Sequence, residues 1–164
     1  MFAQLDTKSV YSFMDSVVDL PSYVKRAKEL GYQALGLMDR DNLYAAYHFA
    51  QLATKNGLRP LIGMEANLVY EGRMIAFRLL AKNNQGYKNL MKLATELSSG
   101  QGEFTALSNY LNEIALILPS EEWEPGMAFE SDVFIGVRPE DAGKEFDYPV
   151  LPLHTVRYFD NVDR

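Results

Sequence analysis

The sequence predicts an α/β domain folded as a seven-stranded β/α barrel, and three observations favour this architecture. Helical and strand-like segments alternate along the 164 residues. An open doubly wound sheet usually carries glycines in its first phosphate-binding turn, and the loop after Asp6 has none. Barrel enzymes instead place polar residues where several strands end, and polar side chains follow nearly every predicted strand. They are Asp6, Lys8, Asp39, Arg40, Glu65, Lys82, Ser120, Arg138, His154 and Arg157.

The first half of the chain contains three predicted strands, at residues 2–6, 34–38 and 60–70. A helix at residues 20–30 begins after the capping residue Asp19 and ends at Gly31. A second helix begins after Asp41 or Asn42 and ends at Gly57. Helical spacing predicts inward positions at Val24, Ala27 and Leu30, and at Leu43, Ala46, Tyr47 and Ala50.

The second half begins with a strand at residues 74–81, joined to the previous strand by a hairpin turn at residues 71–73. Two helices follow, at residues 85–97 and 105–112, and Asn83 or Asn84 caps the first. The first carries Tyr87, Leu90, Met91 and Ala94 at helical spacing. Three more strands lie at residues 114–118, 133–137 and 149–156. With no repeat or linker, residues 1–164 form one domain, and the unfinished end at 159–164 suggests a longer chain.

Composition and charge exclude several kinds of site. The chain has no cysteine and only two histidines, His48 and His154, which excludes disulfides, thiolate zinc sites, iron–sulfur clusters and c-type haem attachment. A formal net charge of −6 makes direct DNA binding by this domain unexpected. No run approaches ~18 apolar residues and the N-terminus has no secretory pattern, so we expect no membrane contact and a cytoplasmic location.

The acids at the strand ends allow two interpretations. Asp6, Asp15, Asp39 and Glu65 could together hold a hard cation, which prefers oxygen ligands. Acids after strands are also turn formers and helix caps, an interpretation that suits Asp39 and Asp41. Neighbouring cations weigh against a metal, because a +1 side chain ~5 Å from a +2 ion is repelled by roughly 6–7 kcal/mol at an effective dielectric of ~20. Lys8, Arg40 and Arg157 are therefore better partners for these acids.

The histidines and serines offer little further chemistry. His48, on a predicted helix, is interpreted as a packing or surface residue, whereas His154 follows a strand and is the better candidate. The sequence has no Gly-x-Ser-x-Gly elbow and no credible Ser-His-Asp set. Trp123 lies among glutamates, which favours a solvated loop over a base-stacking platform.

Four blocks occur in an order that resembles the polymerase-and-histidinol-phosphatase (PHP) domain, most of all the version at the N-terminus of bacterial DNA polymerase III alpha subunits. They are FAQLDTKSVYSFMD at residues 2–15, ALGLMDRDNLY at 34–44, GLRPLIGMEA at 57–66 and LAKNNQGYKNLMKL at 80–93. The segment PVLPLHTVRYFD at 149–160 matches more loosely. The resemblance implies a distorted seven-stranded β/α barrel related to the TIM barrel, whose active members bind divalent metals at the barrel mouth and hydrolyse phosphoesters.

The metal ligands of the family fall mostly on other residue types in this sequence. The resemblance implies histidines at the positions of Gln4, Asp6, Lys8, Arg40 and Arg157, and an aspartate at Thr155. The acids Asp15, Asp39 and Glu65 are kept. We therefore expect no metal and no catalytic residue here. We expect Lys8, Arg40 and Arg157 to form ion pairs with Asp6, Asp15 and Glu65 where the metals would lie.

Three functional hypotheses follow. In the first, this is the N-terminal PHP domain of a bacterial replicative DNA polymerase, structural in role and without phosphoesterase activity. It has no cofactor; Mg²⁺-dependent nucleotidyl transfer, and contacts with DNA and replisome proteins, belong to the full-length polymerase. In the second, Asp6, Asp15, Glu65 and His154 form an altered ligand set for an active metal-dependent phosphoesterase or 3′–5′ exonuclease. In the third, the domain is a free-standing interaction module.

Overall fold

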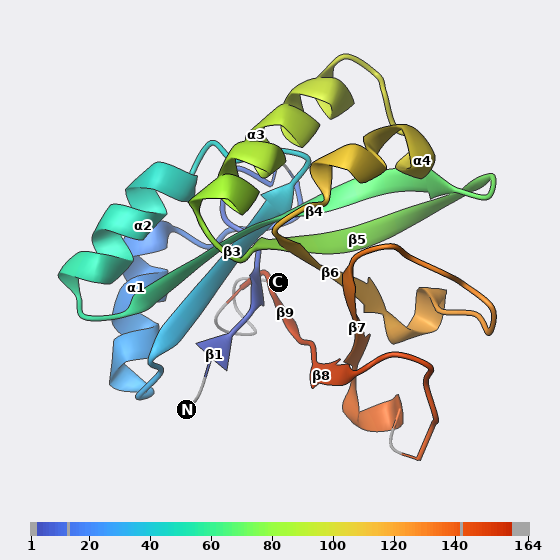
Figure 1. The fold of residues 1–164 in the computed structure, drawn as a ribbon. Coiled ribbons are helices and arrows are strands. Elements are labelled where there is room, and N and C mark those ends of the chain that lie inside the picture. Colours follow the sequence, from blue (N-terminus) through green and yellow to red (C-terminus); the bar gives the residue numbers. More distant parts are fainter. Residues whose placement is uncertain (1–2, 13, 142, 159–164) are drawn as a thin grey trace.

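A curled sheet of seven strands forms the centre of the fold. The computed structural model describes residues 3–12, 14–141 and 143–158. The strands lie in the order β1 (Ala3–Gln4), β3 (Ala34–Arg40), β4 (Arg59–Tyr70), β5 (Arg73–Ala81), β6 (Ile114–Pro119), β7 (Asp132–Val137) and β8 (Val150–Pro152). Only β5 runs antiparallel to its neighbours; the other pairs in this sheet are parallel. The predicted α/β class is confirmed (Figure 1).

A small second sheet connects the two edges of the curled sheet. It pairs β2 (Asp6–Thr7) with β9 (Thr155–Val156) in parallel. Only Leu5 separates β2 from β1, and two residues separate β9 from β8. The predicted seven-stranded barrel is thus a half-barrel sheet whose edges meet through β2 and β9. The predicted first strand is divided into β1 and β2, and the predicted last strand into β8 and β9. Phe2, expected to begin the first strand, and residues 159–164 lie outside the described residues.

The first break has a steric cause at Gly36. The carbonyl oxygen of Leu5 lies so close to Gly36 that a Cβ built there would be 1.9 Å from it. The chain therefore crosses directly over β3 at the position where β3 has no side chain. This crossing carries the polypeptide from the edge of the large sheet to β2.

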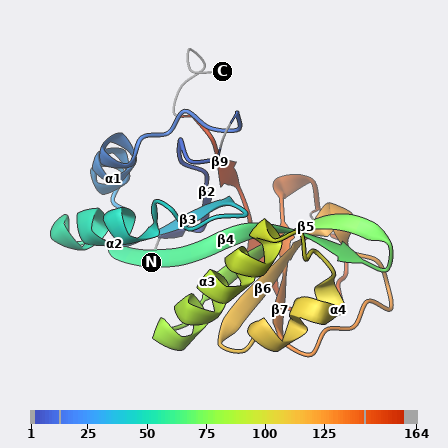
Figure 2. The same cartoon turned by 90° about the horizontal axis from the view of Figure 1, so that it is seen from above.

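Helices cover the outer side of the sheet, as Figure 2 shows. They are α1 (Leu20–Glu29), α2 (Ala46–Lys55), α3 (Asn84–Ser98) and the single turn α4 (Phe104–Leu107). The predicted caps of two helices are confirmed: the Asp19 side chain accepts a hydrogen bond from Ser22 N, and Asn83 accepts from Gln85 N and Gly86 N. The expected helix at 105–112 is α4 followed by a 3₁₀ turn, Ser108–Tyr110. No helix in the described ranges is long and apolar enough to cross a membrane.

The second helix differs from its prediction. It begins at Ala46 after Ala45, and the predicted caps serve other contacts. Asp41 accepts hydrogen bonds from the backbone and side chain of Asn67, and the Asn42 amide donates to the backbone carbonyls of Tyr11 and Arg40. The predicted inward residues Leu30 and Tyr47 are 58% and 71% exposed, and Met91, which lies at helical spacing with Leu90, is 43% exposed.

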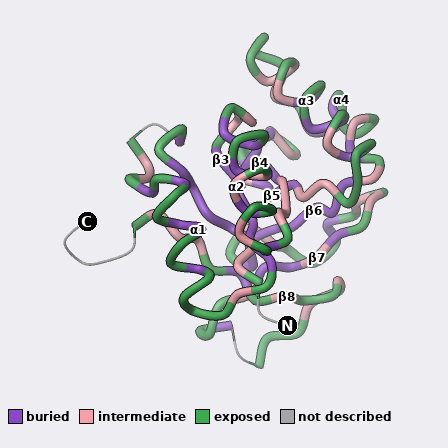
Figure 3. Tube along the Cα trace, turned by 90° about the vertical axis from the view of Figure 1, so that its left-hand side faces the viewer, coloured by how far each residue is buried: buried purple, intermediate pink, exposed green. Residues whose placement is uncertain are grey.

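Two large apolar clusters fill the interior, and Figure 3 shows the central strands as its main buried segments. One lies under α3 and involves β4 to β7. The other joins α1 and α2 to β3, with Phe49 and Ala53 as the fully buried residues of α2. Between β4 and β5, Glu71 and Gly72 have φ values of 49° and 78°, as a two-residue type I′ hairpin requires.

Candidate functional site

Lys8 occupies the centre of a buried charge cluster. It follows β2, and its backbone N–H donates to Val156 O. Its ammonium nitrogen lies 2.8 Å from Asp6 Oδ1 and 3.1 Å from Glu65 Oε2, and donates a third bond to Met38 O at 2.6 Å. Lys8 and Asp6 are completely buried, and Glu65 is 2% exposed. One ammonium group thus joins two carboxylates from separate strands.

Arg78 is a second buried cation on the same two carboxylates. Its Nε lies 3.1 Å from Asp6 Oδ2 and its Nη2 lies 3.1 Å from Glu65 Oε2. Strand register explains the position, because Arg40, Glu65 and Arg78 are paired directly across β3, β4 and β5. The Thr155 hydroxyl of β9 also contacts this buried part of the cluster and donates to Asp6 Oδ2 at 2.6 Å.

The outer part of the cluster lies nearer to solvent. Arg40 Nε is 2.9 Å from Glu65 Oε1, and Arg40 Nη2 is 2.8 Å from Asp15 Oδ2. Arg157 Nε lies 2.8 Å from Asp15 Oδ1 in an ion pair. Each of the three cations expected here, Lys8, Arg40 and Arg157, therefore forms an ion pair with at least one of the three acids. We call the set the charge cluster: Asp6, Lys8, Asp15, Arg40, Glu65, Arg78 and Arg157.

The cations keep the buried carboxyl groups ionised. Burial by itself would raise the pKa of Asp6 and of Glu65, but the charges of Lys8 and Arg78 lower both below their usual values. On the other side, the hydrogen bond to Glu65 raises the pKa of Arg40. The two buried carboxylates are therefore stabilised in their ionised forms by the cations, and Glu65 in turn stabilises the charged form of Arg40.

The remaining predicted site residues lie around the cluster. The Gln4 amide donates to Asp6 O and His154 O. The buried Asp39 carboxylate accepts from Ser9 N, Ser9 Oγ and Ser12 Oγ, so it organises the loop after β2. His154 is exposed and is placed outside the ion-pair contacts of the cluster.

Two residues of the β5 region differ from the sequence-based expectation. The antiparallel direction of β5 explains the position of Lys82, and a different cause explains Arg78. Lys82, expected at the same edge as Lys8, lies at the opposite edge and pairs with Asp132 at the start of β7 at 2.6 Å. Arg78 was missed because it lies within a strand and not at a strand end. Its signal was a lone arginine in the apolar run at residues 74–81.

The residues of the charge cluster do not suit the divalent metals that the resemblance implies. Lys8 and Arg78 already occupy the space between Asp6 and Glu65, and their charges would repel a divalent ion. Within the described ranges, no group of three or more His, Cys, Asp or Glu side chains is placed to hold a metal. We therefore derive no metal-dependent step from this arrangement.

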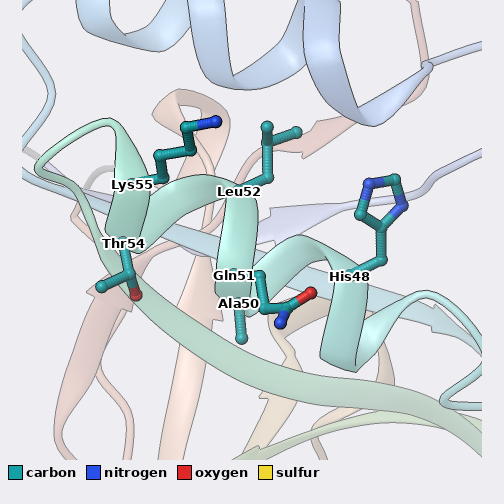
Figure 4. Close-up of a pocket in the computed structure, with 6 residues that line it drawn as sticks. All are labelled: His48, Ala50, Gln51, Leu52, Thr54 and Lys55. Atoms are coloured by element: carbon teal, nitrogen blue, oxygen red, sulfur yellow. The ribbon is translucent and has the colours of Figure 1, made fainter.

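A wide surface depression elsewhere offers no comparable chemistry. It is lined by His48, Ala50, Gln51, Leu52, Thr54 and Lys55. Figure 4 shows that these side chains all project from α2, so groups from different elements do not converge on a ligand there. His48 is exposed, and its interpretation as a surface residue agrees with this position.

The PHP domain model matches residues 4–124, so the chain belongs to the PHP domain family. Over 161 residues it is 46% identical to a DNA polymerase III subunit alpha of Streptococcus pyogenes serotype M3, a match that covers 97% of this chain and 16% of that protein. An error-prone DNA polymerase of Corynebacterium glutamicum is 31% identical over 159 residues, covering 92% of this chain and 14% of that protein. The chain thus spans about a sixth of the length of such relatives.

A solved structure supports the fold alone. A candidate metal-dependent phosphoesterase from Bifidobacterium adolescentis superposes with a TM-score of 0.50 and 16% identity, covering 59% of this chain and 33% of that chain.

Proposed function

We propose that residues 1–164 form the PHP domain of a bacterial DNA polymerase III alpha subunit. In this proposal the domain has a structural role in DNA replication in the cytoplasm. The polymerase relatives support the assignment, since the two described above match 97% and 92% of this chain. Nucleotidyl transfer, its Mg²⁺ ions and the contacts with DNA and replisome proteins then belong to the rest of the polymerase. The acidic net charge of −6 is consistent with a domain that does not itself bind DNA.

We further propose that this domain hydrolyses no phosphoester. The observation that carries this is the Lys8 ammonium held between Asp6 and Glu65. Phosphoesterase chemistry at a divalent site needs ligands that are open to metal and water. Here the carboxylate oxygens are engaged by Lys8, Arg40, Arg78 and Thr155.

In place of catalysis, the charge cluster connects distant parts of the chain. It joins β2, β3, β4 and β5 to the loop that carries Asp15, and Arg157 follows β9 at the end of the described chain. A network of this kind keeps the two ends of the domain together. The rest of the polymerase would then pack against a preformed barrel.

Metal content and hydrolysis assays on the full-length natural protein test this function. After dialysis we expect no stoichiometric zinc or manganese by mass spectrometry, and no hydrolysis of a phosphodiester when Mn²⁺ or Zn²⁺ is added. Hydrolysis that is abolished by Glu65→Gln and His154→Gln, and retained by the surface control His48→Gln, would establish the altered ligand set instead.

The length of the natural reading frame tests the assignment to a polymerase separately. We expect it to continue for many hundreds of residues beyond Arg164 and its product to extend a primed DNA template. A stop codon directly after Arg164 would contradict the polymerase assignment and favour a free-standing module.

A further inference from the structure

The loop after β2 presents several large apolar side chains to solvent, next to the outer part of the charge cluster. Met14 is 92% exposed, and Val10, Tyr11 and Val17 are each about half exposed. Tyr44, in the loop between β3 and α2, is 80% exposed. We call these five residues the apolar patch. A contiguous exposed patch of this kind usually marks an interaction site.

Hydrogen bonds hold the parts of the apolar patch together. The Val10 N–H donates to Val18 O, which brings the beginning and the end of the loop side by side. The Asn42 amide donates to Tyr11 O, and the Asn42 side-chain oxygen accepts from Tyr44 N. The patch is therefore one surface formed by two loops.

Met14 has an unfavourable backbone conformation. Its φ of 60° lies in the left-handed region, which costs a residue with a side chain free energy. The following residue, Asp15, fixes this shape, because its N–H donates to Ser12 O and its carboxylate pairs with Arg40. The loop thus holds a strained residue whose apolar side chain adds no packing to this domain. Strain of this kind is found where a residue is positioned for contact with another group.

The last part of the described chain contacts the same loop. The carbonyl oxygen of Arg157 accepts hydrogen bonds from Val17 N and Ser16 Oγ, and the Arg157 side chain pairs with Asp15. The strand before it, β9, runs beside β2 (Figure 2). This chain covers only 16% of a polymerase relative, so most of such a protein lies outside it. A segment joined to the chain after Arg157 would begin next to the apolar patch and reach it at a high effective concentration.

We propose that the apolar patch is the surface on which the rest of the polymerase docks, namely the chain that follows residue 164 in the natural protein. The proposal rests on the polymerase function proposed above and names the face of the domain that makes the contact. The docked segment is apolar where it meets Met14, Val17 and Tyr44, because only an apolar surface gains free energy by removing these side chains from water.

Oxidation footprinting of methionines in the full-length natural protein, read by mass spectrometry, tests whether the patch is covered. Met14 and Met74 form a matched pair, since both are exposed in this domain and only Met14 belongs to the patch. Relative to the protein unfolded in urea, we expect Met14 to be oxidised at least about tenfold more slowly and Met74 less than about twofold more slowly. A Met14 that reacts as fast as in the unfolded protein would overturn the proposal.

Photocrosslinking identifies what covers the patch. With p-benzoylphenylalanine in place of Tyr44, irradiation of the full-length protein should give crosslinks to residues beyond 164 within the same chain. Adding Met14→Asp should lower the yield of these crosslinks about fivefold or more, whereas the control Met74→Asp should leave it unchanged. Crosslinks between two copies of the chain would identify self-association and overturn the proposal.

Activity separates a failure of this proposal from a failure of the polymerase assignment. A full-length protein that extends a primed DNA template but leaves Met14 open to oxidation would refute the docking surface and leave the assignment intact. A reading frame that stops directly after Arg164 would refute both.

Discussion

At the level of single residues, Lys8 shows why this domain depends on paired charges. Its ammonium group is fully buried and has two carboxylates and one carbonyl oxygen as partners. Removing charges from water costs free energy, which mutual attraction repays only when every group keeps a partner. The cluster meets this condition with three acids and four cations, and the excess cation lies in the half-exposed outer part.

Lys8→Met is therefore expected to be strongly destabilising. Methionine fits the space of the lysine stem, but it leaves Asp6, Glu65 and Met38 O without the ammonium that they share. Breaking a buried pair in this way lowers the free energy of unfolding by about 3–5 kcal/mol. Urea unfolding followed by circular dichroism measures the loss, with the exposed Lys25→Met as control at within about 0.5 kcal/mol of the parent. A loss below about 1 kcal/mol for Lys8→Met would show that Arg78 alone can stabilise the buried carboxylates of Asp6 and Glu65.

The lowered pKa values of Asp6 and Glu65 predict a stability that depends on pH. A carboxyl group with a lower pKa in the folded state stabilises the fold at pH values above its unfolded pKa. That stabilisation is lost as the pH falls through the folded pKa. We expect the melting temperature to decrease when the pH is lowered below about 4, which is the range in which the carboxyl groups of the unfolded chain titrate.

The variant Glu65→Gln isolates the part of this pH dependence that the cluster contributes. It lacks one of the two buried carboxylates, so it should melt lower than the parent at pH ~7 and lose less stability on acidification. Differential scanning calorimetry at a series of pH values would show the two melting curves converge in acid. A constant difference between them at every pH would mean that Glu65 is not stabilised as a carboxylate.

At the level of secondary-structure elements, the hairpin decides whether the site can be predicted from the sequence. The predicted three-residue turn at 71–73 would place Glu65 opposite Leu79. The actual turn has two residues, Tyr70 pairs with Arg73, and Glu65 therefore lies opposite Arg78. The ion pairs of Lys8, Arg40 and Arg157 could be predicted from charge and resemblance alone. The contact of Arg78 could not, because a one-residue error in the turn moves every side chain of β5 to the other face.

The crossing of the Leu5 backbone over β3 gives a second test at this scale. Gly36→Ala would place a methyl group 1.9 Å from Leu5 O, and a backbone atom has little room to move away. We expect a loss of about 2–3 kcal/mol or a failure to fold, because β1 would be displaced from β3. Gly102→Ala is the matched control, since a Cβ there meets no atom within 4 Å. Equal unfolding free energies for the two variants would show that the crossing can relax.

At the level of the whole molecule, the order of the helices and strands could be predicted from the sequence better than the strand breaks and the strand pairing that closes the barrel. Most strands and helices lie close to their predicted residues because apolar periodicity, caps and turn residues are local signals. The break at Leu5 depends on its crossing over Gly36. The pairing of β2 with β9 depends on residues about 150 positions apart. Such contacts leave no periodic trace in either strand. Similarly, the exposure of Tyr47 reflects a missing crossover helix, which the pattern of α2 alone does not reveal.

The closure of the barrel can be tested through Thr155, whose hydroxyl links β9 to Asp6 across 149 residues of sequence. Thr155→Val keeps the shape but removes this hydrogen bond to a carboxylate, which should cost about 1–2 kcal/mol. Contacts between such distant residues require closure of a long loop and are expected to form late in folding. The variant should therefore unfold faster and fold at nearly the parent rate in stopped-flow experiments. Thr95→Val, which loses only an exposed bond within α3, is the control. A slower folding rate for Thr155→Val would instead place barrel closure in the transition state.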